Sequence, residues 1–194
     1  LLQHLGNADE TPIYFDMPRS SIIDQTNTKE VRIISTGYEK IRITVMLCIL
    51  GDEQKLPTYI ILKKKTIPKN EKFLIRCNTK GTSELMQDWV NAVWKRRPSG
   101  ICSSRSLLAL DAFKGHVTSK VKDELRHHSF DLVVILGGMI NQLQPLDVSI
   151  NKPFENYVKG ECEDWLYTDN LPHTASGKIR EAPASTIARW IFDA

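Results

Sequence analysis

Polar and apolar residues alternate through the first part of the chain. This alternation runs from residue 6 to residue 17 and stops at Pro18, which predicts a half-buried strand. Residues 31–36 and 41–50 are rich in β-branched side chains and predict two more strands, and residues 57–65, after the Gly51-Asp52 turn, predict another. The N-terminal part of the chain therefore predicts an antiparallel meander.

The apolar period changes to that of a helix at Glu84. Thr82 or Ser83 can cap this helix, Pro98 ends it, and its apolar positions are Leu85, Met86, Trp89, Val90, Val93 and Trp94. Residues 106–112 then predict a fully buried strand, residues 117–128 a helix and residues 131–138 a second buried strand. Such an alternation calls for parallel strands joined by crossover helices.

A last long helix is predicted to begin near Asp147. One face of it carries Ile150, Phe154, Val158 and Trp165, and Pro153 fits in a first turn but would kink the helix if it lay deeper. Ser185 can cap a short terminal helix that carries Ile187, Trp190 and Ile191.

This order of elements predicts an α/β protein with an RNase H-like fold, a mixed five-stranded sheet with helices on both faces. The pattern alone leaves other α/β folds open. We expect residues 1–168 to form the domain, and residues 169–194 to be a loop and a short helix that belong to it or dock on it.

The composition is that of an ordinary globular chain, with 194 residues, 41% of them hydrophobic and 25% charged. The four cysteines, Cys48, Cys77, Cys102 and Cys162, are scattered without zinc-ligand spacing and are predicted to be reduced, intracellular thiols. No apolar run approaches the ~20 residues of a membrane span, so no membrane partner is expected. The start at Leu1, without Met, suggests a segment of a longer protein.

The net charge of +3 and the pI of about 8.6 permit an anionic partner without requiring one. Lysines cluster at Lys63, Lys64 and Lys65, and basic residues cluster again at 95–97 beside Trp94. Both clusters are equally compatible with contacts to nucleic-acid phosphates and with an ordinary solvated turn or helix end.

Three aspartates stand at positions where chemistry is expected. Asp111 ends a predicted parallel strand, at the edge of the sheet where α/β proteins bind ligands, although a strand-end aspartate taken alone more often caps the next helix or forms a turn. Asp9 shares one face of the first strand with Asn7 and Thr11, and could be a polar edge position. Asp147 lies at a helix start, where a carboxylate is favoured whatever its function.

In the predicted topology these three acids converge. Two carboxylates ~4 Å apart repel by about 4 kcal/mol at an effective dielectric near ~20, so cations are needed to balance them. Mg²⁺ or Mn²⁺ takes oxygen ligands, and two such ions about 4 Å apart can promote displacement at a phosphodiester.

Four stretches of the sequence resemble one family. "NADETPIYFDMP", residues 37–69, "SLLALDAFKGH" and "NQLQPLDVSINKPF" are similar to the DDE transposase domain of the pogo/Tigger group, whose relatives include centromere protein B. The resemblance covers about residues 6–165, and the 35 residues between Asp111 and Asp147 fit a pogo-like spacing with Asp as the third acid.

The resemblance implies a metal-dependent DNA endonuclease and strand transferase located in the nucleus. Asp9, Asp111 and Asp147 match the three catalytic, metal-binding carboxylates of the family and would hold two ions, Mg²⁺ or Mn²⁺. The partner would be DNA, as transposon ends and target or as host chromatin. Self-association into a homo-oligomer is an open alternative to a monomer. Contacts to DNA phosphate are assigned to Lys63, Lys64, Lys65, Lys114 and His116, and His116 could equally cap or pack at the following helix.

Three details qualify this expectation. Gln144 precedes the third acid and is expected to support its loop, whereas Ala112 stands where broader mariner-type enzymes often have Asn. Family members usually carry N-terminal helix-turn-helix modules, which are absent here, so we expect binding through backbone charge with little base readout.

Two other functions stay open. A domesticated, catalytically silent nuclear protein could retain the fold as a DNA-binding or chromatin-associated module. A nuclease acting on RNA is supported only by the shared fold.

Overall fold

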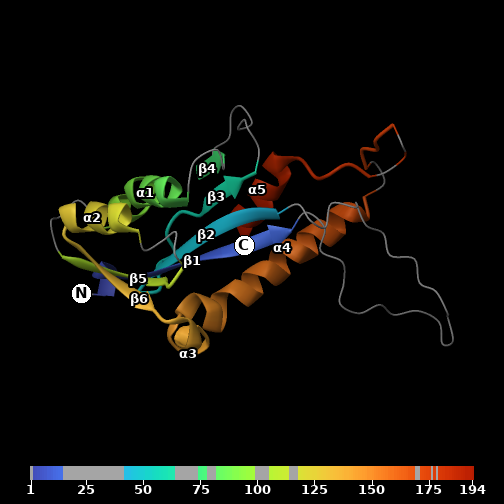
Figure 1. Cartoon of the computed structure of the whole chain (residues 1–194). Helices are drawn as coiled ribbons and strands as arrows, with labels where there is room; N and C mark the ends of the chain where they lie inside the picture. The colour runs from blue at the N-terminus through green and yellow to red at the C-terminus, as the bar shows by residue number, and fades with distance from the viewer. Residues whose placement is uncertain are drawn as a thin grey trace.

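A six-stranded mixed sheet forms the centre of the protein. The computed structural model describes residues 2–14, 42–63, 74–77, 82–98, 105–113, 118–168, 171–175, 177 and 179–194, so the strand predicted at 31–36 lies outside the described residues. The strands are β1 (Leu5–Tyr14), β2 (Arg42–Leu50), β3 (Tyr59–Leu62), β4 (Leu74–Cys77), β5 (Ser106–Asp111) and β6 (Phe130–Ile135). Their order is β4-β3-β2-β1-β5-β6 (Figure 1), so the predicted number of five strands was wrong.

Strand β1 lies in the interior of the sheet. It pairs antiparallel with β2, with Asp9 opposite Leu47, and parallel with β5, with Asn7 opposite Ala109. β5 pairs parallel with β6, as the β-α-β pattern predicted, and β2 pairs antiparallel with β3. The interpretation of Asp9 as an edge position was therefore wrong, because β1 has a neighbour on each side.

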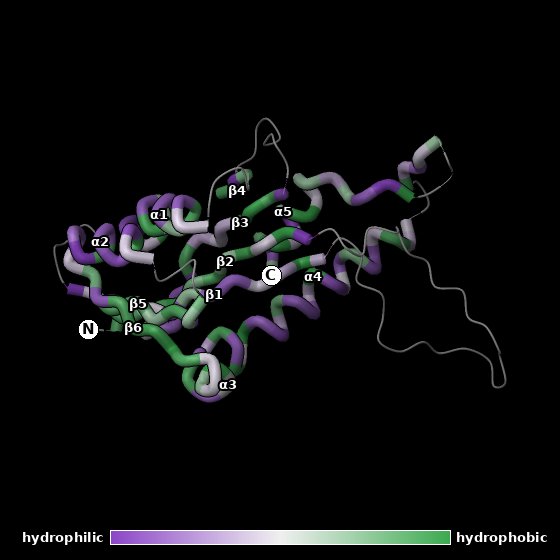
Figure 2. Tube along the Cα trace, in the orientation of Figure 1, coloured by the Kyte–Doolittle hydropathy of each residue, from purple (hydrophilic) through white to green (hydrophobic). Residues whose placement is uncertain are grey.

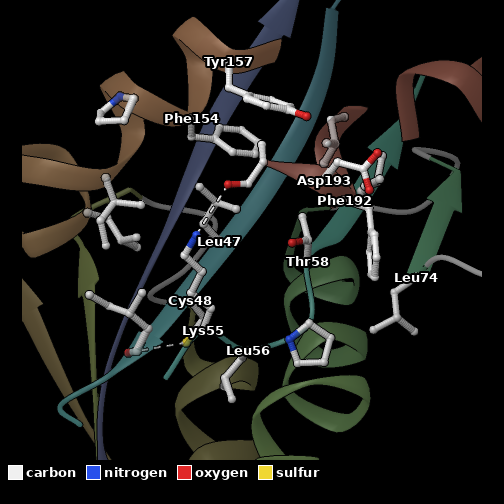
Figure 3. Close-up of a pocket in the computed structure, with 18 of the residues that line it drawn as sticks. Leu47, Cys48, Lys55, Leu56, Thr58, Leu74, Phe154, Tyr157, Phe192 and Asp193 are labelled. Carbon is white, nitrogen blue, oxygen red and sulfur yellow. Dashed lines mark hydrogen bonds between the residues drawn. The ribbon is translucent and has the colours of Figure 1, made fainter. Parts of the chain in front are cut away.

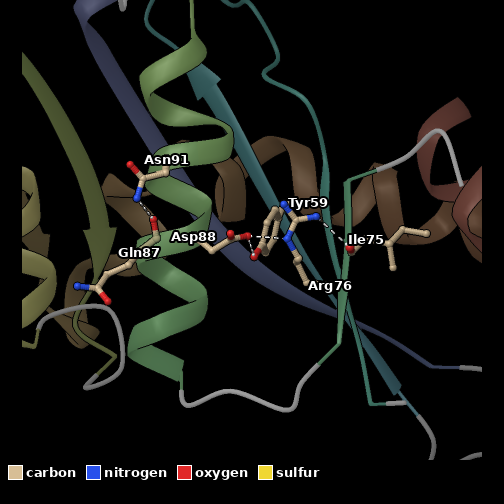
Figure 4. Close-up of polar contacts among 6 residues, drawn as sticks. All are labelled: Tyr59, Ile75, Arg76, Gln87, Asp88 and Asn91. Carbon is tan, nitrogen blue, oxygen red and sulfur yellow. Dashed lines mark hydrogen bonds and ion pairs between the residues drawn. The ribbon is translucent and has the colours of Figure 1, made fainter. Parts of the chain in front are cut away.

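The strand that the sequence did not reveal is β4, which pairs parallel with β3. A cluster of polar side chains joins these two strands to helix α1 (Thr82–Ala92), as Figure 4 shows. The Tyr59 hydroxyl and the Arg76 Nε both donate to Asp88 Oδ2, each at 2.7 Å. Burial and the Asp88 carboxylate raise the pKa of Tyr59 above its usual range, so the phenol stays a donor.

Helices α1 and α2 (Ser119–His127) cover one face of the sheet, and the short 3-10 helix η2 (Trp94–Arg96) follows α1. The apolar side of α1 packs on the sheet through Leu85, Met86, Trp89 and Val90, as the helical spacing predicted. α2 adds Val121 and Leu125 to the same core, and the Thr118 side chain caps its first turn by accepting from Val121 N.

The other face is covered by α4 (Asn151–Leu166) and α5 (Ala184–Asp193), as Figure 1 shows. Phe154 and Val158 of α4 meet Ile187, Trp190 and Ile191 of α5 in a second core on β1, β2 and β3. Pro153 lies in the first turn of α4, where a proline is tolerated. Ser185 lies inside α5, after its N-cap Pro183, so its predicted role as a cap was wrong.

The remaining elements are short. They are the 3-10 helices η1 (Leu2–His4) and η3 (Gly137–Met139), α3 (Ile140–Leu143) and the π-helical segment η4 (Leu146–Ile150). η3, α3 and η4 connect β6 to α4, and no helix in the described part of the chain is long and apolar enough to cross a membrane. The described cysteines Cys48, Cys77 and Cys162 are free thiols. Figure 2 shows the apolar strands between helices whose outward sides are largely hydrophilic.

Strands β5 and β6 were predicted to be fully buried, and this was wrong. In β5 the side chains of Leu108 and Leu110 are buried against α1 and α2, whereas Leu107, Ala109 and Asp111 on the opposite face are only half-buried. In β6 the exposed fraction of Val133 reaches 42%. Among the described elements, α4 and η4 contact β1 and β2, and neither helix covers the whole of this face of β5 and β6.

Arg97 belongs to the core and not to a DNA-binding cluster. Only 2% of its surface is exposed, and its guanidinium stacks on the rings of Trp94 and Phe130, at 4.3 and 5.0 Å from their centroids. Its Nη1 donates to the Trp94 carbonyl at 2.7 Å, and burial lowers its pKa. Of the basic cluster at 95–97, Arg97 is therefore unavailable to phosphate.

Gly6 in β1 leaves room for the indole of Trp94, which yields the first prediction. A β-carbon at position 6 would come within 2.5 Å of Trp94 Cη2, and Trp94 is fully buried. We expect Gly6→Ala to destabilise the protein by about 3 kcal/mol, since overfilling a packed core forces side chains out of their rotamers. Urea unfolding followed by tryptophan fluorescence measures this loss.

The matched control is Gly160→Ala in α4, where an added β-carbon meets nothing within 4 Å. This change should raise stability by about 0.5–1 kcal/mol, as alanine favours a helix more than glycine does. Equal stabilities for the two variants would show that the Gly6–Trp94 contact does not limit packing.

Candidate active site

One face of β1 carries polar side chains that contact the segment from η4 to α4. The Asn7 side chain donates from Nδ2 to the Ala109 carbonyl at 3.2 Å and accepts at Oδ1 from Leu146 N at 3.3 Å. Further along the strand, Thr11 Oγ1 donates to Glu155 Oε1 at 2.8 Å. Asn7, Asp9 and Thr11 therefore share one face, as their alternation predicted.

Asp9, between Asn7 and Thr11, is linked to Asp147 through one amide. Asn151 Nδ2 donates to Asp9 Oδ2 at 2.7 Å and to Asp147 Oδ1 at 2.9 Å. Asp147 and Asn151 are four residues apart on a helical segment and so lie on the same side of it. The amide can only be oriented this way, because turning it over would place its oxygen between two carboxylates.

Asp111 is the last residue of β5 and lies on the same side of the sheet as Asp9. Ala8 of β1 and Leu110 of β5 belong to the core under α1 and α2, so their neighbours Asp9 and Asp111 face the opposite way. Its alternative role as a cap of the next helix was wrong, since Thr118 caps α2. Asp147 lies in the first turn of η4, where the helix start also favours a carboxylate.

The pKa of Asp9 is affected by the charges of the other two acids. This pKa is raised to about 6, mainly by burial and also by the charges of Asp147 and Asp111, against the lowering effect of the hydrogen bond from Asn151. The Gln144 amide also lowers this pKa, although neither of its buried amide atoms has a partner at hydrogen-bonding geometry. Asp9 thus lies where negative charge is poorly balanced.

The donor set is suited to a hard divalent cation. Three carboxylates from β1, β5 and η4 face one region, and the buried Oδ1 of Asn151 and Oε1 of Gln144 have no hydrogen-bond partner there. Oxygen atoms of carboxylates and amides are the ligands that Mg²⁺ and Mn²⁺ prefer. Within the described ranges, no three His, Cys, Asp or Glu side chains form a ready-made coordination group, and the Asn151 amide lies between two of the acids.

Of the basic residues assigned to DNA phosphate, only Lys63 is described, and it is exposed at the end of β3. Lys64, Lys65, Lys114 and His116 lie outside the described residues.

Sequence reasoning did not single out Asn151. The signal was an asparagine four residues after Asp147 inside a predicted helix, where asparagine is an unfavourable choice unless its side chain has a partner. Gln144 was expected to support the loop of the third acid, and its fully buried side chain lies directly before Pro145 and η4.

A pocket of about 860 Å³ is lined by residues of β2, η4, α4 and α5. Figure 3 shows it between β2, α4 and α5, with Phe154, Tyr157 and Phe192 around it and Lys55 Nζ donating to the Ala194 carbonyl at 3.5 Å. None of the three acids is among the described side chains that line it.

The sequence matches the family model of the DDE superfamily endonuclease over residues 40–191. The chain belongs to the DDE superfamily endonuclease family.

The curated relatives of this DDE domain include proteins named for the pogo transposable element. It is 38% identical over 193 residues to the human Pogo transposable element with KRAB domain, covering 97% of this chain and 32% of that protein, and the mouse protein matches equally. A human Pogo transposable element with ZNF domain is 26% identical over 156 residues, or 77% of this chain and 11% of that protein. The chain thus spans about a third of the length of the first two.

Solved structures similar to this DDE domain share its fold. A pre-cleavage Mos1 transpososome has a TM-score of 0.56 at 12% identity and covers 98% of this chain and 52% of that one. The Mos1 mariner paired end complex with Mn has a TM-score of 0.56 at 13% identity, with 100% of this chain and 53% of that one covered. The expected RNase H-like α/β fold is confirmed, with six strands in place of five.

Proposed function

We propose that this DDE domain cuts phosphodiester bonds of DNA with the help of divalent cations held by Asp9, Asp111 and Asp147. The observation that carries the proposal is the convergence of three carboxylates from β1, β5 and η4: the Asn151 amide joins Asp9 to Asp147, and the charges of Asp147 and Asp111 add to the burial that raises the pKa of Asp9 to about 6. Carboxylates brought this close have a cost unless a cation balances them. A structural role alone gives no reason to gather them beside a partly open sheet face.

Each acid has a distinct part in holding the cations. Asp9 lies on the interior strand and accepts a hydrogen bond from Asn151, which holds its carboxylate toward α4. Asp147 is fixed by the same amide, and Asp111 is half-buried at a strand end, nearest to where a substrate would approach. Bound Mg²⁺ or Mn²⁺, two ions in this proposal, would activate the attacking water or hydroxyl and stabilise the leaving oxygen.

The open face of β5 and β6 supports DNA as the substrate. A DNA duplex is much wider than a side chain, so it reaches an acid cluster most easily where the sheet is not fully covered by helices. Leu107, Ala109 and Asp111 face this open side. Two of the similar structures are, by name, Mos1 paired end complexes with Mn and with Mg, which supports the choice of cation.

Binding of the DNA backbone by Lys63, Lys64, Lys65, Lys114 and His116 stays part of the proposal. Lys63 is exposed at the end of β3, so its ammonium group is accessible to a phosphate. Location in the nucleus stays a prediction, because a nuclease that acts on chromosomal DNA must reach it there. Self-association into homo-oligomers also stays a prediction, because the joining of two transposon ends favours it.

The test is DNA nicking by the full-length protein. Supercoiled plasmid carrying the terminal repeats of the element is incubated with the protein and Mn²⁺ or Mg²⁺, and nicked circles are separated on agarose. We expect nicking that requires the cation and disappears with excess chelator. Plasmid that stays supercoiled with both cations, together with calorimetry that detects no Mn²⁺ binding, would favour the catalytically silent, chromatin-associated protein instead.

A further inference from the structure

Asn151 is placed to act on both carboxylates at once. It is the first residue of α4, its exposed fraction is 7%, and its single Nδ2 donates to Asp9 of β1 and to Asp147 of η4. An amide nitrogen carries two protons, so both bonds use its full donor capacity. The side chain thereby balances part of two negative charges without adding a positive one.

The partnerless oxygen of Asn151 argues against a purely structural role. Oδ1 is buried and has no hydrogen-bond partner, and an unsatisfied buried acceptor costs ~1–3 kcal/mol. If Asn151 only held α4 against β1, its amide oxygen would be expected to have a hydrogen-bond partner as well. Thr11 makes such a structural link two residues along the strand, through one hydrogen bond to Glu155.

We propose that Asn151 is a positioning residue that fixes the Asp9 and Asp147 carboxylates for divalent cations. The inference rests on the proposed function, because it assigns the two acids to the cation site. With the amide in place, the two carboxylates of separate elements have one relative orientation before any cation arrives. Without it, each carboxylate is free to rotate, and cation binding must supply that order itself.

The test compares two variants that each remove one polar link between β1 and α4. Asn151→Leu keeps the approximate side-chain shape and removes both donors, and Thr11→Val keeps the shape of Thr11 and removes its link to Glu155. The affinity of the full-length protein for Mn²⁺ is measured by isothermal titration calorimetry. Loss of groups that orient metal ligands typically weakens affinity by about 10–100-fold.

We expect Asn151→Leu to weaken Mn²⁺ binding by at least about tenfold and Thr11→Val to leave it within about twofold. Asn151→Ser, which keeps one donor, should fall between them, and it serves if the leucine variant does not fold, as judged by circular dichroism. Unchanged affinity in a folded Asn151→Leu or Asn151→Ser variant would overturn the inference and leave the proposed function standing. A wild-type protein that binds no Mn²⁺ would overturn both.

Discussion

Asp111→Asn is expected to lower cation-dependent nicking by at least about 1,000-fold while the fold is retained. Loss of one carboxylate from a cation site removes several kcal/mol of transition-state stabilisation, and each ~1.36 kcal/mol corresponds to a factor of ten in rate. Asp111 is half-buried at the end of β5, so an asparagine of the same shape fits without repacking the core. Nicked plasmid is quantified at several times under single-turnover conditions.

The matched control is Asp131→Asn on the neighbouring strand β6. Asp131 lies opposite Leu107 in the parallel register and pairs with Arg105 at the surface, at 2.5 Å between Oδ2 and Nε. It is a carboxylate near the open face that has no part in the proposed chemistry, so its variant should nick at the wild-type rate. An Asp111→Asn protein as active as this control would exclude Asp111 from catalysis.

The second large effect concerns stability. We expect Asp9→Asn to stabilise the cation-free domain by up to roughly 3 kcal/mol at pH 7.5, because the pKa of Asp9 is about 6 in the folded protein against an ordinary 3.8, and each pH unit between corresponds to about 1.36 kcal/mol. Asparagine has no charge to bury, and its oxygen can still accept from Asn151 Nδ2.

The sign of the effect follows from which state holds the proton more tightly. The folded wild type binds the Asp9 proton more tightly than the unfolded chain, so its stability is highest below pH 3.8 and falls as the pH rises through about 6. The advantage of Asp9→Asn should therefore be small at pH 4 and fully developed above pH 6. Urea unfolding in the presence of chelator, repeated between pH 4 and 7.5, measures the difference. A difference that does not change over this range would mean that Asp9 ionises normally.

The elements that position the acids could be predicted because each has a strong periodic signal. The alternation through Asn7, Asp9 and Thr11 fixed which of their side chains share a face, and hydrogen bonds of all three to the segment from η4 to α4 agree with it. The helical spacing at α1 and the apolar runs at β5 and β6 likewise gave the right elements. Local periodicity is what a single sequence encodes best.

Features that depend on distant contacts could not be predicted. β4 has four residues, too few to show a period, and its place depends on Arg76 meeting Asp88 of α1. The burial of Arg97 depends on Trp94 and Phe130, which are separated by much of a β-α-β unit. The openness of β5 and β6 on one face depends on the path of α4, which no apolar pattern within those strands records.

Adjacent residues of the interior strand β1 face the core on one side and the acid cluster on the other. Ala8 faces the core under α1 and α2, and Asp9 faces the acids on the other side. Because the two sides alternate with a period of two, inserting one amino acid early in β1 would exchange them, so that a carboxylate would face the tryptophans and a methyl group would face Asp111 and Asp147. The same alternation along β1 therefore sets both which residues pack in the core and which residues face the other acids. Insertions or deletions are expected to be tolerated only beyond the ends of this strand.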